Sequence, residues 1–332
     1  MIELQRDQLC VSFPEVHRDA VLSIGFQRTL RIPDDNRAYP LPPGLGCFPL
    51  RHVDDYPDRV PKEWKQHGGV MLPMYQAEAM WLSFHSPFDY PFAVKVATGK
   101  VSAVTGEQWR EGLNRDPQDY LDIPRQPWLD GYVVRKGVIR QFVAMPLGSG
   151  YSAEEQVAGR EEHGGLQLLV YPLRAEVWER RRSVAESMML MEEKVRYDRH
   201  FAVSSFAMGL SPGGRMRQEI YEDSNRIEEW DQLASSRCFV HLVNSRVWNR
   251  VTSETSPTTP PMARDYARAG LPWFDYYSEG TRAVEASDTL AGLKGLAEMY
   301  EEKEGKPLWD NDSVVPEVIV AHGARRVREG TF

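Results

Sequence analysis

The chain has 332 residues, of which 42% are hydrophobic and 27% are charged. This composition is typical of a folded globular protein and excludes a disordered one, and the length allows one large packed unit or two smaller ones. The formal net charge of -8 argues against general nucleic-acid binding, because an acidic protein repels phosphate backbones.

Strand-like runs alternate with turn signals over the first half of the chain, residues 1–172. Hairpins are expected within residues 8–32, 92–104 and 131–145, where β-branched or apolar runs flank turn-forming residues. Residues 105–113 begin with the spacing of a capping box, which predicts a short helix. This half is therefore predicted to be a β-rich body of antiparallel hairpins.

The hydrophobic period changes over residues 174–197, which form the strongest helix prediction in the chain. Val184, Met188, Met191 and Val195 recur at spacings of four, three and four, as in a narrow heptad seam. One interpretation is an amphipathic helix packed on the sheet, and the other is a self-association seam. The predicted fold class is α+β, with a β-rich body of antiparallel hairpins, one long central helix and a few short helices.

The same helix is the best candidate for a domain boundary. Hairpin-rich sequence over residues 1–172 precedes it, and residues 173–332 combine the long helix with mixed α and β sequence. The helix resembles a core element more than a linker, so the two parts can also form a single packed domain.

A glycine-rich stretch with Gly148, Gly150 and Ser152 has the spacing GxGxxA after an apolar strand and at the start of a helix. In a dinucleotide-binding fold such glycines let a phosphate group approach the helix N-terminus. Here Gly159 ends the helix after about two turns and no series of βαβ units surrounds it. A glycine turn with a helix cap is the favoured interpretation, and an anion-binding site is the alternative.

Five aromatic residues lie beside predicted loops and strand ends: Trp128, Trp273, Phe274, Tyr276 and Tyr277. Large rings with polar tips are common anchors of recognition surfaces. They are also a usual way to fill a β-rich core. We therefore consider both a binding surface and a core role for these residues.

No short catalytic or metal-binding motif is found, and no metal site is predicted. Cys238 and His241 are close in sequence but favour a buried cysteine and a hydrogen-bonded histidine. The three cysteines have no CxxC spacing, which fits a reducing compartment. With no secretory h-region and no apolar run of about 20 residues, we expect a cytoplasmic protein without membrane insertion.

These patterns favour a non-catalytic binding or assembly protein that presents aromatic loops and an amphipathic helix on a β-rich body. Its partner would be a protein, either a second copy or another chain. The alternative is a cytosolic enzyme of an unrecognised family, whose pocket draws His, Asp and Glu residues from distant segments. The sequence identifies no catalytic residue, substrate or cofactor.

Overall fold

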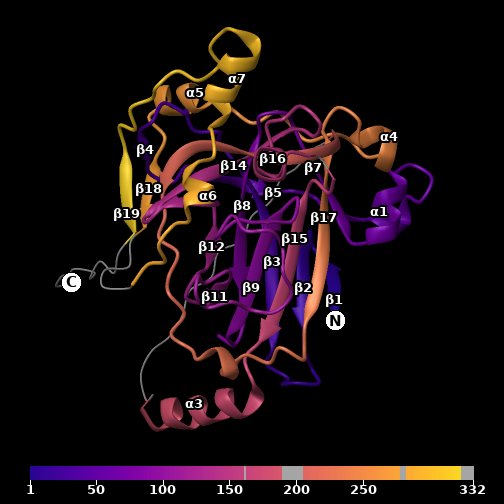
Figure 1. Ribbon diagram of the computed structural model, residues 1–332, viewed down its shortest axis with the longest axis vertical. Coiled ribbons are helices and arrows are strands. Elements are labelled where there is room, and N and C mark those ends of the chain that lie inside the picture. Colours follow the sequence, from indigo (N-terminus) through magenta and orange to yellow (C-terminus); the bar gives the residue numbers. More distant parts are fainter. Residues whose placement is uncertain (161, 189–204, 277–281, 323–332) are drawn as a thin grey trace, which may run out of the picture.

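The computed structural model describes residues 1–160, 162–188, 205–276 and 282–322. A sheet of 17 strands forms the body of the molecule, and a second sheet has two strands (Figure 1). The large sheet contains β1 (Ile2–Gln5), β2 (Gln8–Ser12), β3 (Val21–Thr29), β4 (Ala38–Tyr39), β5 (Gly44–Cys47), β6 (Arg51–His52), β7 (Val70–Met74), β8 (Ala79–His85), β9 (Phe92–Thr98), β10 (Val101–Ser102), β11 (Leu121–Ile123), β12 (Trp128–Leu129), β13 (Gly131–Arg135), β14 (Val138–Pro146), β15 (Leu166–Pro172), β16 (Ser205–Arg217) and β17 (Ser236–Asn244). The small sheet contains β18 (Trp273–Tyr276) and β19 (Ile319–His322).

The strands of the large sheet pair in the order β1-β2-β3-β8-β14-β16-β17-β15-β9-β11, all antiparallel. Two further pairs, β4 with β16 and β7 with β17, are parallel. The long strands β14 and β16 curve across the molecule (Figure 1), and the rings of Phe13, after β2, and Phe92, in β9, lie 6.2 Å apart. Both rings belong to one buried cluster. The two ends of the sheet therefore fold over a common apolar core.

The helices are short and lie around the margins of the sheet (Figure 1). The α-helices are α1 (Lys62–His67), α2 (Ala153–Ala158), α3 (Ala175–Met188), α4 (Trp248–Thr252), α5 (Ala263–Arg268), α6 (Asp288–Ala291) and α7 (Leu296–Glu304), and the 3-10 helices are η1 (Val53–Asp55) and η2 (Ile227–Glu229). None of the described helices is long and apolar enough to cross a membrane.

The three predicted hairpins are confirmed. Strands β2 and β3, β9 and β10, and β13 and β14 each pair antiparallel. In the second hairpin Gly99 and Lys100 both have positive φ angles, 52° and 61°, as a tight two-residue turn requires. Turn chemistry therefore determined these local pairings.

The predicted fold class is wrong in its helical part. The structure is mostly antiparallel sheet, and the described residues contain no long central helix. The helix predicted over residues 174–197 corresponds to α3, which is described over Ala175–Met188 and lies at one end of the molecule (Figure 1). Residues 189–197 lie outside the described part. A helix in a core needs a wide apolar stripe, whereas only Val177 is buried among the α3 side chains that the structure describes.

Polar contacts hold α3 against the body. His17 Nε2 lies 2.7 Å from Glu179 Oε1, and Arg181 donates hydrogen bonds to Asn225 (2.6 Å) and Glu229 (3.0 Å). The Arg181 side chain therefore faces the body and holds α3 against it. Four residues predicted to form a self-association seam have side chains outside the described part: Val184, Met188, Met191 and Val195.

Strands from the two predicted parts of the chain pair directly with each other. From residues 1–172, β14 pairs with β16 and β15 pairs with β17, both of which belong to residues 173–332. The division of the chain at residue 172 stays a prediction.

Candidate functional site

The small sheet of β18 and β19 lies at one side of the molecule, near β4 (Figure 1). Its inner strand is anchored by the fully buried Trp273, whose ring lies 6.2 Å from that of Tyr39 and 6.0 Å from that of Tyr266. Leu41 and Phe274 exchange two backbone hydrogen bonds of 2.8 and 2.9 Å. These contacts fix β18 to the body and leave β19 as the outer strand.

Exposed apolar side chains concentrate on the segment that carries β19. Nine large apolar side chains are exposed among the described residues, and five of the nine lie within residues 309–320. The five are Trp309 (56% exposed), Val315 (72%), Val318 (42%), Ile319 (50%) and Val320 (37%). A concentration of this kind is typical of an interaction site, because isolated exposed apolar residues are normally scattered.

The outer edge of β19 also offers unpaired backbone groups. The carbonyl of Val318 accepts a 2.8 Å hydrogen bond from the amide of Trp273, so it points toward β18. Because backbone groups alternate along a strand, Ile319 and Ala321 direct theirs to the opposite edge. No strand in the described part of the chain pairs with that edge. An edge strand with exposed apolar residues is a template for the addition of another strand.

The structure brings together only some of the predicted aromatic binding residues. Trp273 lies in the core and Phe274 is partly exposed next to it in β18, whereas Trp128 lies in β12 on the large sheet. Tyr277 and the side chain of Tyr276 lie outside the described residues. β19 was not predicted, although the run VVPEVIV (residues 314–320) has the β-branched composition of a strand.

The predicted anion-binding stretch is filled by a carboxylate of the protein itself. The Ser152 hydroxyl accepts a hydrogen bond from the Glu155 amide (3.2 Å), and the Glu155 carboxylate accepts from the amides of Ser152 (3.1 Å) and Gly150 (2.6 Å). Gly148 and Gly150 both have positive φ angles, as a glycine turn requires. The capping interpretation is therefore confirmed at α2, and Glu155 occupies the place that an external anion would take.

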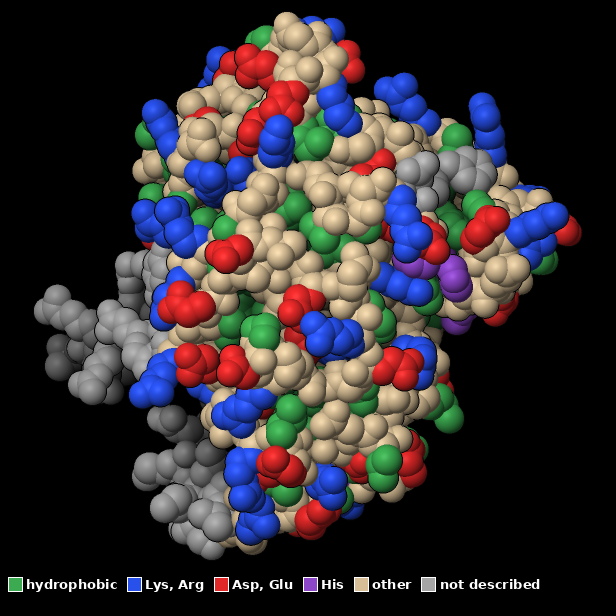
Figure 2. All heavy atoms as spheres, viewed as in Figure 1, with side chains coloured by type: hydrophobic (Ala, Val, Ile, Leu, Met, Phe, Trp, Pro, Cys, Tyr) green, Lys and Arg blue, Asp and Glu red, His purple; other side chains and the backbone are tan. Residues whose placement is uncertain are grey.

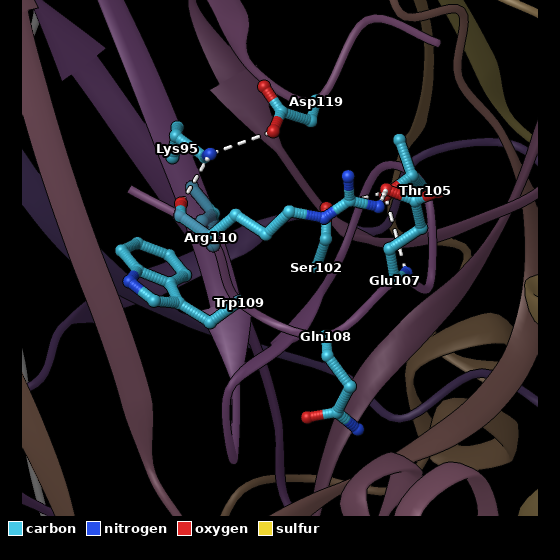
Figure 3. A pocket seen from close by; sticks show the side chains of 9 residues that line it. Lys95, Ser102, Thr105, Glu107, Gln108, Trp109, Arg110 and Asp119 are labelled. Carbon is cyan, nitrogen blue, oxygen red and sulfur yellow. Dashed lines mark hydrogen bonds and ion pairs between the residues drawn. The ribbon is translucent and has the colours of Figure 1, made fainter. Parts of the chain in front are cut away.

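The ammonium group of Lys95 lies beside a small cavity next to β9 and has a structural role. Figure 3 shows the Lys95 side chain directed at the loop of residues 105–119. Its ammonium donates to the carbonyls of Arg110 (2.8 Å) and Gly112 (2.6 Å) and to the Asp119 carboxylate (2.7 Å). All three donors are used, and the cavity of about 10 Å³ has room for one water molecule. Lys95 therefore holds this loop in place.

The short helix predicted over residues 105–113 is wrong, because this segment is a loop in the structure. Gly106 and Gly112 have positive φ angles of 72° and 76°, which a right-handed helix does not allow. The carbonyls of Arg110 and Gly112 accept from Lys95 instead of from helical amides. Hydrogen bonds from Lys95, which lies outside the segment, thus replace the helical hydrogen bonds that the capping-box spacing predicts.

A cleft of about 270 Å³ gathers charged side chains from three distant segments, residues 115–118, 222–223 and 284–285. Its lining residues are Arg115, Asp116, Pro117, Gln118, Glu222, Asp223, Val284 and Glu285. Figure 2 shows Lys and Arg interspersed with Asp and Glu over one face of the molecule, so that face has no large area of a single charge. The cleft, by contrast, is lined by four carboxylate side chains and one guanidinium, that of Arg115.

A pair of buried carboxyl groups lies beside this cleft. The Asp223 carboxylate accepts hydrogen bonds from Tyr120 (2.6 Å) and from the backbone amide of Asn225 (2.7 Å). Burial, and then the charge of Asp223, raise the pKa of Asp122 to about 7. Asp122 Oδ2 accepts no hydrogen bond within the described residues. A carboxyl group protonated near neutral pH beside a hydrogen-bonded carboxylate can exchange protons, but Asp122 and Asp223 are only 2% and 5% exposed.

The Cys238 and His241 pair in β17 is structural. His241 is 2% exposed, its Nε2 lies 3.0 Å from the Gly68 carbonyl, and burial lowers its pKa to about 4. Burial raises the pKa of the Cys238 thiol to about 11. Figure 2 shows histidine side chains gathered near α1, where the His67 ring stacks on Phe239 at 4.3 Å. Neither the neutral imidazole nor the protonated thiol is prepared for nucleophilic catalysis at neutral pH.

Within the described residues, no three His, Cys, Asp or Glu side chains are grouped closely enough to hold a metal ion. Comparison with known proteins gives no match, whether with a protein-family model, a curated protein or a solved structure. A functional site can therefore be identified only from the geometry of the described residues. Among the sites described, the edge of β19 is the best supported.

Proposed function

We propose that the chain is a non-catalytic assembly protein whose contact surface is the free edge of β19, and that the strand added there is β19 of a second copy. The observation that carries this proposal is the coincidence of exposed apolar side chains with an unpaired strand edge. Addition of a strand satisfies the backbone groups and covers the apolar residues in one step.

A two-fold axis is compatible with the strand geometry. In an antiparallel pair, two residues directly opposite each other direct their backbone groups either both toward the partner strand or both away from it. The outward-facing Ile319 can therefore lie opposite Ile319 of the second copy and exchange two backbone hydrogen bonds with it. Val318 of each copy then lies opposite Val320 of the other. The two small sheets become one sheet of four strands with apolar residues at its centre.

The expected dimer is weak. Three half-exposed side chains on each copy, Val318, Ile319 and Val320, contribute roughly 1 kcal/mol each when buried, or about 6 kcal/mol together. A few backbone hydrogen bonds add roughly 1 kcal/mol each, and association costs about 4 kcal/mol or more. The net free energy of about 5 kcal/mol corresponds to a dissociation constant of about 0.2 mM or weaker. Because each copy has a net charge of -8, salt should strengthen the dimer by screening repulsion.

Sedimentation velocity over a wide concentration range tests the proposal. The wild-type chain should form a concentration-dependent dimer, and Ile319→Lys should abolish it. Ile319→Pro, which removes an outward-facing amide, should also abolish it, whereas the control Leu233→Lys, at a site 97% exposed elsewhere, should not. A monomer at all concentrations, or a dimer indifferent to both changes at Ile319, would refute assembly through this edge.

An enzyme remains the second candidate function, supported by the cleft of about 270 Å³ beside Asp223 and by the raised pKa of Asp122. A general acid or base works best with a pKa near the working pH. Native mass spectrometry of the purified chain tests this candidate. A small molecule that stays bound to the wild type and is lost in Arg115→Met would support it, and the absence of any retained molecule would count against it.

A further inference from the structure

A cavity of about 80 Å³ lies between segments far apart in the sequence, and Trp309, 56% exposed, is part of its wall. The turn between β7 and β8, the loop before α5, the segment after α7 and Arg31 all contribute to it. Its lining residues are Arg31, Tyr75, Gln76, Ala77, Glu78, Thr259, Pro260, Pro261, Met262, Trp309 and Asp310. The function proposed above does not involve this cavity.

One wall carries a buried guanidinium with unused donors. The Arg31 side chain is 7% exposed, and its Nη2 donates to the carbonyls of Trp309 (3.3 Å) and Asp310 (2.8 Å). Its Nε and Nη1 donate to no residue in the described ranges. A guanidinium carries five N–H donors, so the three on Nε and Nη1 are not used by the described residues.

The Asp310 carboxylate is in the complementary position. It is 14% exposed, and its oxygens lie 3.7 Å from Arg31 Nη2 and 3.8 Å from Arg264 Nε, beyond hydrogen-bond distance. It accepts no hydrogen bond from any side chain or amide that the structure describes. By contrast, Glu78 in the same wall is satisfied, because it accepts from Arg28 (2.6 Å) and from the Tyr75 amide (2.8 Å). Arg31 and Asp310 thus meet at one cavity as a long ion pair of 3.7 Å, in which Nε and Nη1 of Arg31 and the Asp310 carboxylate make no hydrogen bond to the described residues.

Backbone strain is found at the same place. Ala77 and Asp310 have positive φ angles of 64° and 57°, and both line the cavity. Such conformations cost about 1–3 kcal/mol for a residue with a side chain and collect where a ligand is held. Two residues with unfavourable backbone conformations therefore line the same cavity as Arg31.

The chemistry of the walls selects a neutral ligand with one acceptor and one donor. Arg31 and Asp310 carry opposite charges, so a carboxylate or an ammonium ligand would leave a net charge in a confined space. A primary carboxamide can place its carbonyl oxygen toward Arg31 and its NH₂ group toward Asp310. Pro260, Pro261 and Met262 provide an apolar surface for the carbon atoms next to the amide.

We propose that this cavity binds a primary carboxamide, presented either by a small free amide or by an asparagine or glutamine side chain of a peptide. The volume corresponds to two or three water molecules at about 30 Å³ each, so bound water is the competing occupant. The amide would replace this water and satisfy both charged groups.

Ligand-observed NMR with three probes of similar size tests the proposal on the wild-type chain. Propionamide should bind saturably, and propionate and propylammonium should not. Preferential binding of either charged probe would overturn the proposal. Binding of none of the three would leave water as the occupant and would also overturn it.

Variants localise the binding to the cavity. Arg31→Met should weaken propionamide at least tenfold, Arg31→Lys should weaken it while keeping the charge, and the exposed control Arg237→Met should leave it unchanged. Circular dichroism shows whether each variant is folded, and the selectivity among the probes does not depend on any variant. Unchanged affinity in folded Arg31→Met would refute this location.

A blocked tripeptide with a central glutamine distinguishes the two sources of the amide, with the glutamate peptide as its control. Tighter binding of the glutamine peptide than of propionamide assigns the site to peptides, and weaker binding assigns it to small amides. Equal binding of the glutamine and glutamate peptides would contradict amide recognition. The assay is independent of assembly, because Ile319→Lys should leave propionamide binding intact.

Discussion

Replacement of Lys95 by methionine should be among the most destabilising single changes on the large sheet. The Lys95 and Asp119 side chains are 4% and 9% exposed, so their 2.7 Å ion pair is shielded from water (Figure 3). Methionine keeps most of the length of the side chain but removes the charge and all three hydrogen bonds. Removal of one partner of a buried pair costs about 3–5 kcal/mol, because the other charge stays buried. The free energy of unfolding should therefore fall by about 3–5 kcal/mol.

Urea denaturation followed by tryptophan fluorescence measures this loss. The matched control is Arg237→Met, because Arg237 and Glu111 also form a 2.8 Å pair but are both 69% exposed, and its cost should be about 1 kcal/mol or less. Adding Asp119→Asn to the Lys95→Met chain should restore part of the stability, by roughly 1–2 kcal/mol, since it removes the stranded charge. A loss of stability no larger than that of Arg237→Met, or strictly additive effects of Lys95→Met and Asp119→Asn, would refute the stabilising role of the buried Lys95–Asp119 pair.

Three further changes follow from buried polar groups. The native state keeps a proton on Asp122 that the unfolded state releases above about pH 4, so the free energy of unfolding of the wild type should fall as the pH rises from about 4 to about 7. Urea denaturation at a series of pH values should show a smaller fall for Asp122→Asn. An equal dependence of the free energy of unfolding on pH in the two chains would contradict the raised pKa. Gly295→Ala should lower the melting temperature, because its Cβ would collide with the buried Asp34–Arg140 pair, and an unchanged melting temperature would show that the pair can move. Glu154 accepts three backbone amides at 2.8–2.9 Å, so Glu154→Gln should cost about 1–3 kcal/mol by urea denaturation, and a neutral change would show that the loop re-forms its bonds.

The local parts of the fold were predictable from the sequence. The three hairpins and the cap of α2 follow from turn and capping chemistry over a few residues, such as Gly99 with Lys100 and Ser152 with Glu155. The inert character of Cys238 and His241 followed from their places on a strand. In each case the interacting groups are neighbours in sequence, whereas the capping-box spacing of residues 105–113 did not produce a helix, because Lys95 holds that segment as a loop.

The candidate sites were not predictable in this way. The cavity near Trp309 needs Arg31 beside Asp310, and these residues are joined only when the segment after α7 docks near the end of β3. The edge of β19 is free because, in the described part, β19 pairs only with β18. The amino-acid composition of a strand does not show which strands it pairs with. The same run of apolar residues would occur in a covered strand.

The sequence by itself determined the three hairpins, the cap of α2 and the acidic charge, but neither the loop at residues 105–113 nor β19. The tertiary structure alone decided the place of α3, which the sequence put at the centre of the fold. Its seam satisfies a helical period, but among the α3 side chains that the structure describes only Val177 is buried, and Arg181 donates a hydrogen bond to Asn225 at the end of the sheet. Periodicity reports which residues share a face, whereas only the packed structure shows whether any surface is available to cover that face.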